Sequence, residues 1–283
     1  MFTIGFITDE VSQNLFEAAK FAYRFQFSAV ELRSVEGKGP FEWDESDKNR
    51  IRDELNQFGL TLKAISTPLF KCDISDEGTI QAHIASFSTL ADFAKTCGCS
   101  ILRGFDFWES GAPLSLRVEK LRPIVKICEE KDVTLALEYD PSVHSNTPDK
   151  IAELVRTIGS DHVRALYDPG NGLWSDPSQM PYPTGYNVLK DLFCHIHVKD
   201  AILTHEGAQA VCVGTGLVDY LGLFRELKAT GYDGCVMLET HYRKDSKLSE
   251  EQLRTPGGIT FSNGAEDASM DSMEAMLKII HNA

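Results

Sequence analysis

Short runs of mostly apolar residues recur along the chain, and segments with apolar residues at helical spacing separate them. Most of the runs are almost continuously apolar, which is typical of parallel strands that are covered on both faces. We therefore predict strands over residues 3–8, 29–34, 61–66, 100–105, 134–139, 163–167, 193–198 and 234–239.

Amphipathic segments fill the intervals between these runs. Residues 15–25, for example, place Leu15, Ala18, Ala19 and Ala22 on one side of a helix. Further helices are predicted over residues 49–58, 80–96, 114–130, 148–158, 186–192, 220–229 and 270–281.

The alternation of strand and helix indicates an α/β protein, and about eight strands favour a closed (β/α)8 TIM barrel over an open sheet. No low-complexity tract divides the 283 residues, so we expect a single TIM-barrel domain over residues 1–283. Long loops are expected after strands, and barrel enzymes build their active sites on the face where the strands end. These loops cover residues 37–46, 174–184, 203–216 and 241–265.

The chain is acidic, with 42 Asp and Glu against 28 Lys and Arg and a formal net charge of −14. This balance disfavours a nucleic-acid partner, because phosphate backbones usually bind a basic face. No apolar run approaches the roughly 18 residues of a membrane span, and residues 1–7 are predicted to form a strand rather than a signal peptide. The seven scattered cysteines predict reduced thiols in a cytoplasmic protein.

A residue able to bind a divalent metal lies at or near the end of each of four successive apolar strands: Glu138, Asp168, His197 and Glu239. The first three are spaced by about 30 residues, which is one repeat of an eightfold barrel of about 250 residues. The longer interval before Glu239 leaves room for an extended loop. Because barrel strands end on one face, we expect the four side chains to converge in a metal site.

Two Glu, one Asp and one His form an oxygen-rich ligand set that suits one divalent ion, Mn²⁺, Mg²⁺ or Co²⁺, and also holds Zn²⁺. His195 and His197 point to the same face of their strand. His197 lies nearer the rim and is the predicted ligand, with His195 as the alternative ligand or a supporting group. Lys199 shares this face, and we predict that its ammonium contacts the substrate, with an ion pair to Asp200 as the alternative.

Six motifs in this order resemble the xylose isomerase-like barrel superfamily, in particular its sugar phosphate isomerase/epimerase branch. They are AVELR at 29–33, ALE at 136–138, YDPGN at 167–171, HIHVKD at 195–200, VGTGLVDY at 213–220 and LETH at 238–241. The resemblance implies that Glu138, Asp168, His197 and Glu239 hold the metal. It also implies that Glu138 and Glu239 are the catalytic acid/base pair of an isomerase or epimerase. Such an enzyme moves a proton of a sugar or related polyol-ketone through a metal-stabilised enediolate.

The chain departs from the ketose 3-epimerases around this predicted site. Asn171 stands where those enzymes have a His, Leu203 where they have an Arg, and His144 where they have a Glu. These differences argue against a free ketose as the substrate. We predict substrate contacts from Glu31, Arg33, Arg103, His144, Asn171 and Lys199, with a rim salt bridge as the alternative for Glu31 and Arg33.

A dehydratase of the inosose or dehydroshikimate type is the main alternative function, since loss of β-hydroxide can follow the same proton removal. An endonuclease IV-like hydrolase would need several metals and a His near Thr67 and Pro68, which close the third strand instead. A non-catalytic sugar-binding protein would not require both glutamates. The expected partner is a small carbohydrate or polyol, and a homo-oligomer is left open.

Overall fold

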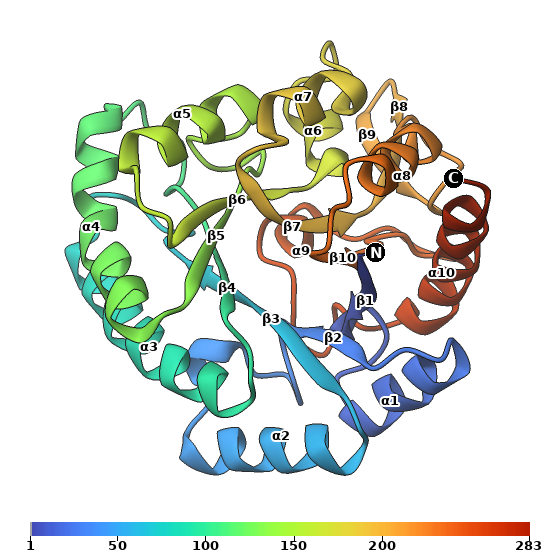
Figure 1. Cartoon of the computed structure of the whole chain (residues 1–283), viewed down its shortest axis with the longest axis horizontal. Coiled ribbons are helices and arrows are strands. Elements are labelled where there is room, and N and C mark those ends of the chain that lie inside the picture. Colours follow the sequence, from blue (N-terminus) through green and yellow to red (C-terminus); the bar gives the residue numbers. More distant parts are fainter. Residues whose placement is uncertain (1) are drawn as a thin grey trace.

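A closed barrel of eight parallel strands forms the centre of the computed structural model, which describes residues 2–283 (Figure 1). The order around the barrel is β1-β10-β7-β6-β5-β4-β3-β2. The barrel strands are β1 (Thr3–Ile7), β2 (Ala29–Leu32), β3 (Thr61–Leu69), β4 (Ile101–Gly104), β5 (Thr134–Glu138), β6 (Val163–Tyr167), β7 (Phe193–Val198) and β10 (Cys235–Leu238). The predicted (β/α)8 TIM barrel is confirmed.

The barrel closes between its first and last strands. Thr3 to Phe6 of β1 lie in parallel register with Cys235 to Leu238 of β10. Every residue of β2 and of β10 is buried. This burial explains the continuous apolar runs in the sequence, because a barrel strand faces the interior on one side and the helices on the other.

Helices surround the barrel on its outer side (Figure 1). They are α1 (Leu15–Arg24), α2 (Glu45–Gln57), α3 (Glu77–Thr96), α4 (Leu114–Lys131), α5 (Pro148–Ile158), α6 (Pro169–Ser175), α7 (Tyr186–Leu189), α8 (Tyr220–Ala229) and α10 (Ala265–Asn282). Several helices have an N-cap residue whose side-chain oxygen accepts a backbone hydrogen bond. Examples are Asn14 at α1, Asp44 at α2 and Thr147 at α5. The last helix begins at Ala265, earlier than the predicted residue 270.

The four predicted long loops contain short regular elements, so they are not irregular throughout. A 3₁₀ turn, η2 (Pro40–Glu42), lies in the first loop, and the turn η3 (Pro181–Gly185) begins in the second. The third contains most of a hairpin, β8 (Asp200–Thr204) and β9 (Gly207–Val211), and the fourth contains α9 (Glu250–Arg254). One further 3₁₀ turn, η1 (Thr8–Glu10), follows β1.

Asp200 ties together the root of the β8–β9 hairpin. Its carboxylate accepts hydrogen bonds from the backbone N–H groups of Gly214, Gly216 and Val218 at 2.9, 2.9 and 3.1 Å. A Cβ atom at Gly216 would collide with this carboxylate, so the glycine allows the close approach. The hairpin therefore leaves and rejoins the barrel wall at one point.

The described helices include none that is both long and apolar enough to cross a bilayer. The seven cysteines are free thiols, and Cys72, Cys99, Cys128 and Cys235 are buried.

Gly5 of β1 leaves no room for a side chain, because a Cβ atom would collide with the carbonyl oxygen of Ala29 and lie 2.6 Å from Sδ of Met237. We expect Gly5→Ala to lower the free energy of unfolding by about 1–3 kcal/mol, the usual cost of overfilling a packed core. Chemical denaturation measures the difference. Gly78→Ala in the exposed first turn of α3 is the control and should cause no loss. Equal losses in the two variants would contradict the steric argument.

Candidate metal centre

Four potential metal ligands meet at the C-terminal end of the barrel. Glu138 ends β5, Asp168 follows β6, His197 lies near the end of β7, and Glu239 follows β10. One donor atom from each of the four residues lies within 4.8 Å of the donor atoms of the others, and all four residues are buried. The structure thus brings together the residues whose sequence spacing predicted a metal site.

The donor atoms of this group fit a divalent ion. Nδ1 of His197 lies 3.3 Å from Glu239 and 3.5 Å from Glu138, yet it makes no hydrogen bond among the described residues. Oδ2 of Asp168 is also buried, and its neighbour is the ammonium group of Lys199 at 2.6 Å. Buried polar atoms usually have partners, and a divalent ion would satisfy Nδ1 of His197. Three carboxylates and one imidazole match the preferences of Mn²⁺, Mg²⁺, Co²⁺ and Zn²⁺.

Lys199 bridges two of the carboxylates. Its ammonium nitrogen lies 2.6 Å from Oδ2 of Asp168 and 2.6 Å from Oε2 of Glu239. Burial raises the pKa of the Asp168 carboxyl group to about 7, against the opposing effect of Lys199. A Cβ atom at Gly170 would collide with the Lys199 side chain, so this glycine makes room for the lysine. A metal ion at this site would compete with the ammonium for the same oxygens.

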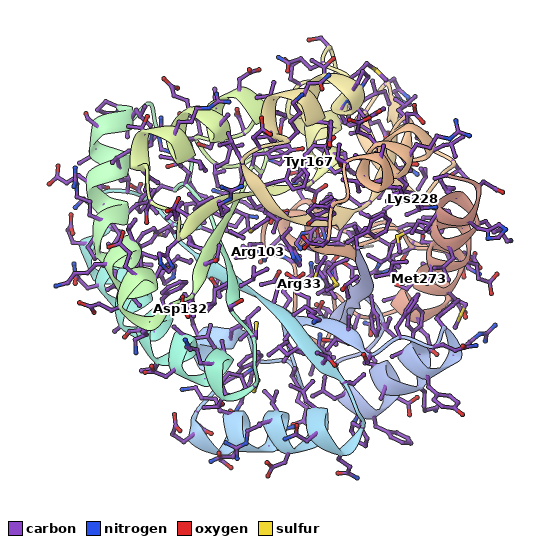
Figure 2. All side chains as sticks on the ribbon, viewed as in Figure 1. Arg33, Arg103, Asp132, Tyr167, Lys228 and Met273 are labelled. Atoms are coloured by element: carbon purple, nitrogen blue, oxygen red, sulfur yellow. The ribbon has the colours of Figure 1, made fainter. Side chains whose placement is uncertain are left out.

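Two arginines approach the glutamates from other strands. Nη1 of Arg33, which follows β2, donates to Oε1 of Glu239 at 2.6 Å, and Nη1 of Arg103 in β4 lies 3.1 Å from Oε2 of Glu138. Both arginines lie near the centre of the barrel in Figure 2. Burial alone would raise both glutamate pKa values, but Arg103 brings the pKa of Glu138 down to about 2. Lys199 is the largest of the charges that hold the pKa of Glu239 well below its usual range, so both glutamates are ionised at neutral pH.

A second group of potential ligands already holds a cation. Donor atoms of Glu10, Glu239 and His241 lie within 4.8 Å of one another. The guanidinium group of Arg33 sits among them, 2.9 Å from Glu10, 2.6 Å from Glu239 and 3.5 Å from the His241 ring nitrogen. This group therefore binds an arginine in the position that a second metal ion would need.

A cavity of about 270 Å³ adjoins the metal group. Its polar lining includes Glu138 and Glu239 together with three of the predicted substrate contacts, Arg103, Asn171 and Lys199. Apolar side chains complete the enclosure, namely those of Phe105, Pro141, Trp174, Leu253 and Pro256. A few convergent polar groups in an apolar enclosure are typical of small-molecule sites, where the polar groups fix the orientation of the ligand.

Asn171 links two of the metal-group carboxylates. Its Nδ2 atom donates to Oε1 of Glu138 at 3.1 Å and to the carbonyl oxygen of Tyr139 at 2.9 Å. Its backbone N–H donates to Oδ1 of Asp168 at 3.1 Å, so Asp168 also serves as the N-cap of α6. The side-chain amide therefore fixes the orientation of Glu138 at the edge of the cavity.

His144 lies outside the described lining of this cavity, although the sequence predicted a substrate contact. Its Nε2 atom accepts hydrogen bonds from the backbone N–H groups of Ser110 and Ala112 at 3.1 and 3.2 Å. Its Nδ1 atom faces the carbonyl oxygen of Asp106 at 3.1 Å. Both ring nitrogens are thus engaged by the loop after β4, and the observed role of His144 is to hold that loop.

Two other predicted substrate contacts, Glu31 and Arg33, also lie apart from this cavity. Arg33 lines a neighbouring cavity of about 270 Å³ and is held by buried acidic residues. Glu31 is completely buried and hydrogen-bonded to His195 and His197. The alternative prediction for both residues was a rim salt bridge, and Arg33 does form salt bridges with Asp9, Glu10 and Glu239, all of them buried.

Two buried basic residues of the cavity, Lys71 and His241, were not predicted from the sequence. Lys71, just beyond β3, lies 2.9 Å from Asp140 and over the ring of Phe105 at 4.6 Å. His241 also lines the cavity. His241 follows Glu239 by two residues, the spacing that singled out the predicted lysine, so a signal was present. Lys71 lies in the irregular segment after β3, where no periodic pattern marks it.

The family model described as "xylose isomerase-like TIM barrel" matches residues 19–276. The chain belongs to this family. An inosose dehydratase of Geobacillus kaustophilus is 20% identical over 230 residues, which cover 68% of this chain and 71% of that protein. The structure of an IolI protein with a bound zinc atom is similar, with a TM-score of 0.73 and 18% identity over 98% of both chains. A D-allulose 3-epimerase from Methylomonas sp. has a TM-score of 0.73 and 16% identity, also over 98% of both chains.

We expect the purified protein to bind about one divalent ion per chain. Asp168→Asn should weaken Mn²⁺ binding by more than about 100-fold, because losing a ligand costs more than losing a group that merely orients one. Titration calorimetry and metal analysis measure both quantities. Asp161→Asn, an exposed change just before β6, is the matched control. Equal Mn²⁺ affinity in wild type and Asp168→Asn would contradict the assigned ligand set.

Proposed function

We propose that this protein is a divalent-metal-dependent isomerase or epimerase of a sugar or related polyol-ketone. The main observation behind this proposal is that Glu138 and Glu239 both belong to the metal group and both line the cavity. They come from β5 and β10, which are separated around the barrel by β6 and β7. Two carboxylates that approach one substrate from different strands are suited to remove a proton and to return it.

The ligand set consists of Glu138, Asp168, His197 and Glu239, and it would hold Mn²⁺, Mg²⁺, Co²⁺ or Zn²⁺ beside the cavity. When bound, the ion supplies Lewis acidity that polarises the substrate carbonyl. One ionised glutamate accepts the proton from the carbon next to that carbonyl. The other glutamate first takes up a proton from solvent or from a substrate hydroxyl group, and then delivers it either to the opposite face of the same carbon or to its neighbour. The first outcome is an epimer and the second is an aldose–ketose isomer.

Arg103 and Lys199 adjust the basicity of the two glutamates. Before the substrate binds, Arg103 pairs with Glu138, and Lys199 pairs with Glu239. Both cations also line the cavity, where negative charge develops on the substrate oxygen as the proton leaves. A cation drawn toward that oxygen stabilises it and at the same time leaves its carboxylate a stronger base.

The apolar side of the cavity suits the carbon face of a sugar ring or a cyclic polyol. Phe105 and Trp174 supply aromatic surface, and Leu253 and Pro256 come from the segment at α9. Aromatic side chains bury large apolar areas, so they also exclude water from the ionised intermediate.

A dehydratase is the second candidate, and the similarity to an inosose dehydratase favours it. Removal of the same proton followed by loss of hydroxide from the β-carbon yields an unsaturated ketone and water. The glutamate that returns a proton in an isomerase would instead protonate the departing hydroxide. Asn171, which replaces the His of the ketose 3-epimerases, fits a substrate other than a free ketose and agrees with either reaction.

Two further alternatives have less support. An endonuclease IV-like hydrolase needs several metal ions, whereas Arg33 fills the second ligand group and the net charge is −14. A sugar-binding protein without catalysis has no requirement for two ionised glutamates beside one cavity.

Replacement of either glutamate should stop exchange at carbon. We expect Glu138→Gln and Glu239→Gln each to slow deuterium uptake from D₂O into a substrate by about 10²- to 10⁴-fold, because an amide does not accept the proton. Mass spectrometry measures uptake at saturating Mn²⁺, with the bound metal checked in each sample. Glu119→Gln on the exposed side of α4 is the control. Wild-type uptake in both site variants would refute the acid/base assignment.

A panel of ketoses, keto-glycosides and keto-cyclitols in D₂O separates the two candidate reactions. A recovered isomer that carries solvent deuterium supports the isomerase, and a product lighter by one water supports the dehydratase. Removal of the ion with a chelator should abolish either reaction, and added Mn²⁺ should restore it. Turnover that persists after complete metal removal would count against both candidates.

A further inference from the structure

Glu31 lies inside the barrel, in contact with the metal group but outside the set of four ligands. It belongs to β2, on the opposite side of the barrel order from β6, and its side chain is completely buried. It is absent from the described lining of the cavity beside Glu138 and Glu239. A buried carboxylate is unfavourable unless hydrogen bonds compensate for its lost hydration, so its partners indicate its role.

Three side chains converge on this carboxylate. Nε2 of His195 lies 2.7 Å from Oε2 of Glu31, and Nε2 of His197 lies 3.1 and 3.2 Å from its two oxygens. The hydroxyl group of Ser66 donates to Oε1. Since an ionised carboxylate only accepts hydrogen bonds, both imidazoles must present an N–H group to it.

This contact determines which nitrogen of His197 is available to a metal. In the neutral ring that a metal requires, one nitrogen keeps its hydrogen and the other offers a lone pair. Glu31 engages Nε2, so the lone pair falls on Nδ1. Nδ1 is the atom that lies 3.5 Å from Glu138 and 3.3 Å from Glu239, within the predicted ligand set.

We propose that Glu31 is a positioning residue that fixes the tautomer and ring orientation of His197 for metal binding, rather than a substrate contact. His195 and Ser66 hold the Glu31 carboxylate in place, which gives His195 a supporting role instead of that of a ligand. This inference rests on the metal centre of the proposed function. It adds to the four ligands a buried hydrogen-bonding layer on the other side of the imidazole ring.

Titration calorimetry with Mn²⁺ tests the proposal on the full-length protein. Glu31→Gln should weaken Mn²⁺ binding by about 10- to 100-fold, the usual loss when the partner of a ligating histidine is removed. Glu31→Asp keeps the charge but shortens the side chain, so its affinity should lie between those of wild type and Glu31→Gln. Ser66→Ala removes one donor to Glu31 and should cause a smaller loss. Glu119→Gln is the matched exposed control and should bind as wild type does.

A second measurement separates positioning from a general effect on the fold. In the Zn²⁺-loaded wild type, ¹⁵N-resolved NMR should show the His197 proton on Nε2 and protected from exchange with solvent. In Glu31→Gln this proton should exchange faster or move to the other nitrogen. Urea denaturation of the metal-free proteins reports any loss of fold, and Glu31→Asp and Ser66→Ala supply the answer if Glu31→Gln does not fold.

The outcomes distinguish this proposal from the proposed function. If wild type binds Mn²⁺ and the folded Glu31 variants bind it equally well with the same His197 tautomer, the positioning role is overturned while the metal centre stands. If wild type binds no divalent ion, the metal centre itself is refuted, and this inference with it. Weaker binding together with an altered His197 signal supports the proposal.

Discussion

The structure at the C-terminal end of the barrel depends on one constraint, namely that its buried negative charges must be compensated by positive ones. Glu138, Asp168 and Glu239 bring three carboxylates within 4.8 Å of one another in a buried site. Isolated charges in such surroundings cost several kcal/mol each, so the arrangement requires partners. Arg103 and Lys199 supply cationic groups at 3.1 Å or less from these oxygens. These cations stabilise the buried carboxylates when no metal is bound. They also keep the carboxylate oxygens close together, where a divalent ion can bind them.

The barrel achieves this concentration of charge by repeating one simple device. Each of four apolar strands in the wall has a polar residue at or just beyond its C-terminal end, namely Glu138, Asp168, His197 and Glu239. The strands are parallel and closed in a ring, so residues distant in sequence emerge on the same face. The chemistry therefore depends on a fold-wide register, and Gly5 shows how tightly neighbouring strands must pack to maintain it.

The sequence predicted most of the fold and the convergence of the four residues of the metal group, because both depend on periodic local signals. Apolar runs and amphipathic segments recur often enough to reveal the eight strands, and a ligand recurs at the same point of successive repeats. The roles of Glu31 and Arg33 follow instead from contacts across 166 and 206 residues, to His197 and Glu239, which no local pattern encodes. His144 stands where the ketose 3-epimerases have a Glu and was predicted to contact the substrate, but the loop backbone engages both of its ring nitrogens. The short β8–β9 hairpin lacks a long apolar pattern and was predicted as a loop.

The Asp200 clamp has a consequence for how this barrel tolerates change. Because one carboxylate gathers the backbone at Gly214, Gly216 and Val218, the two ends of the hairpin segment meet before the chain continues into α8. The residues between these two ends then form a closed local loop, so a change in their number or flexibility acts within that loop. Insertions or substitutions between residues 203 and 212 can alter the rim of the barrel while β7, which carries His195 and His197, keeps its register. The clamp thus separates the hairpin from the barrel framework, with the boundary set by a single side chain.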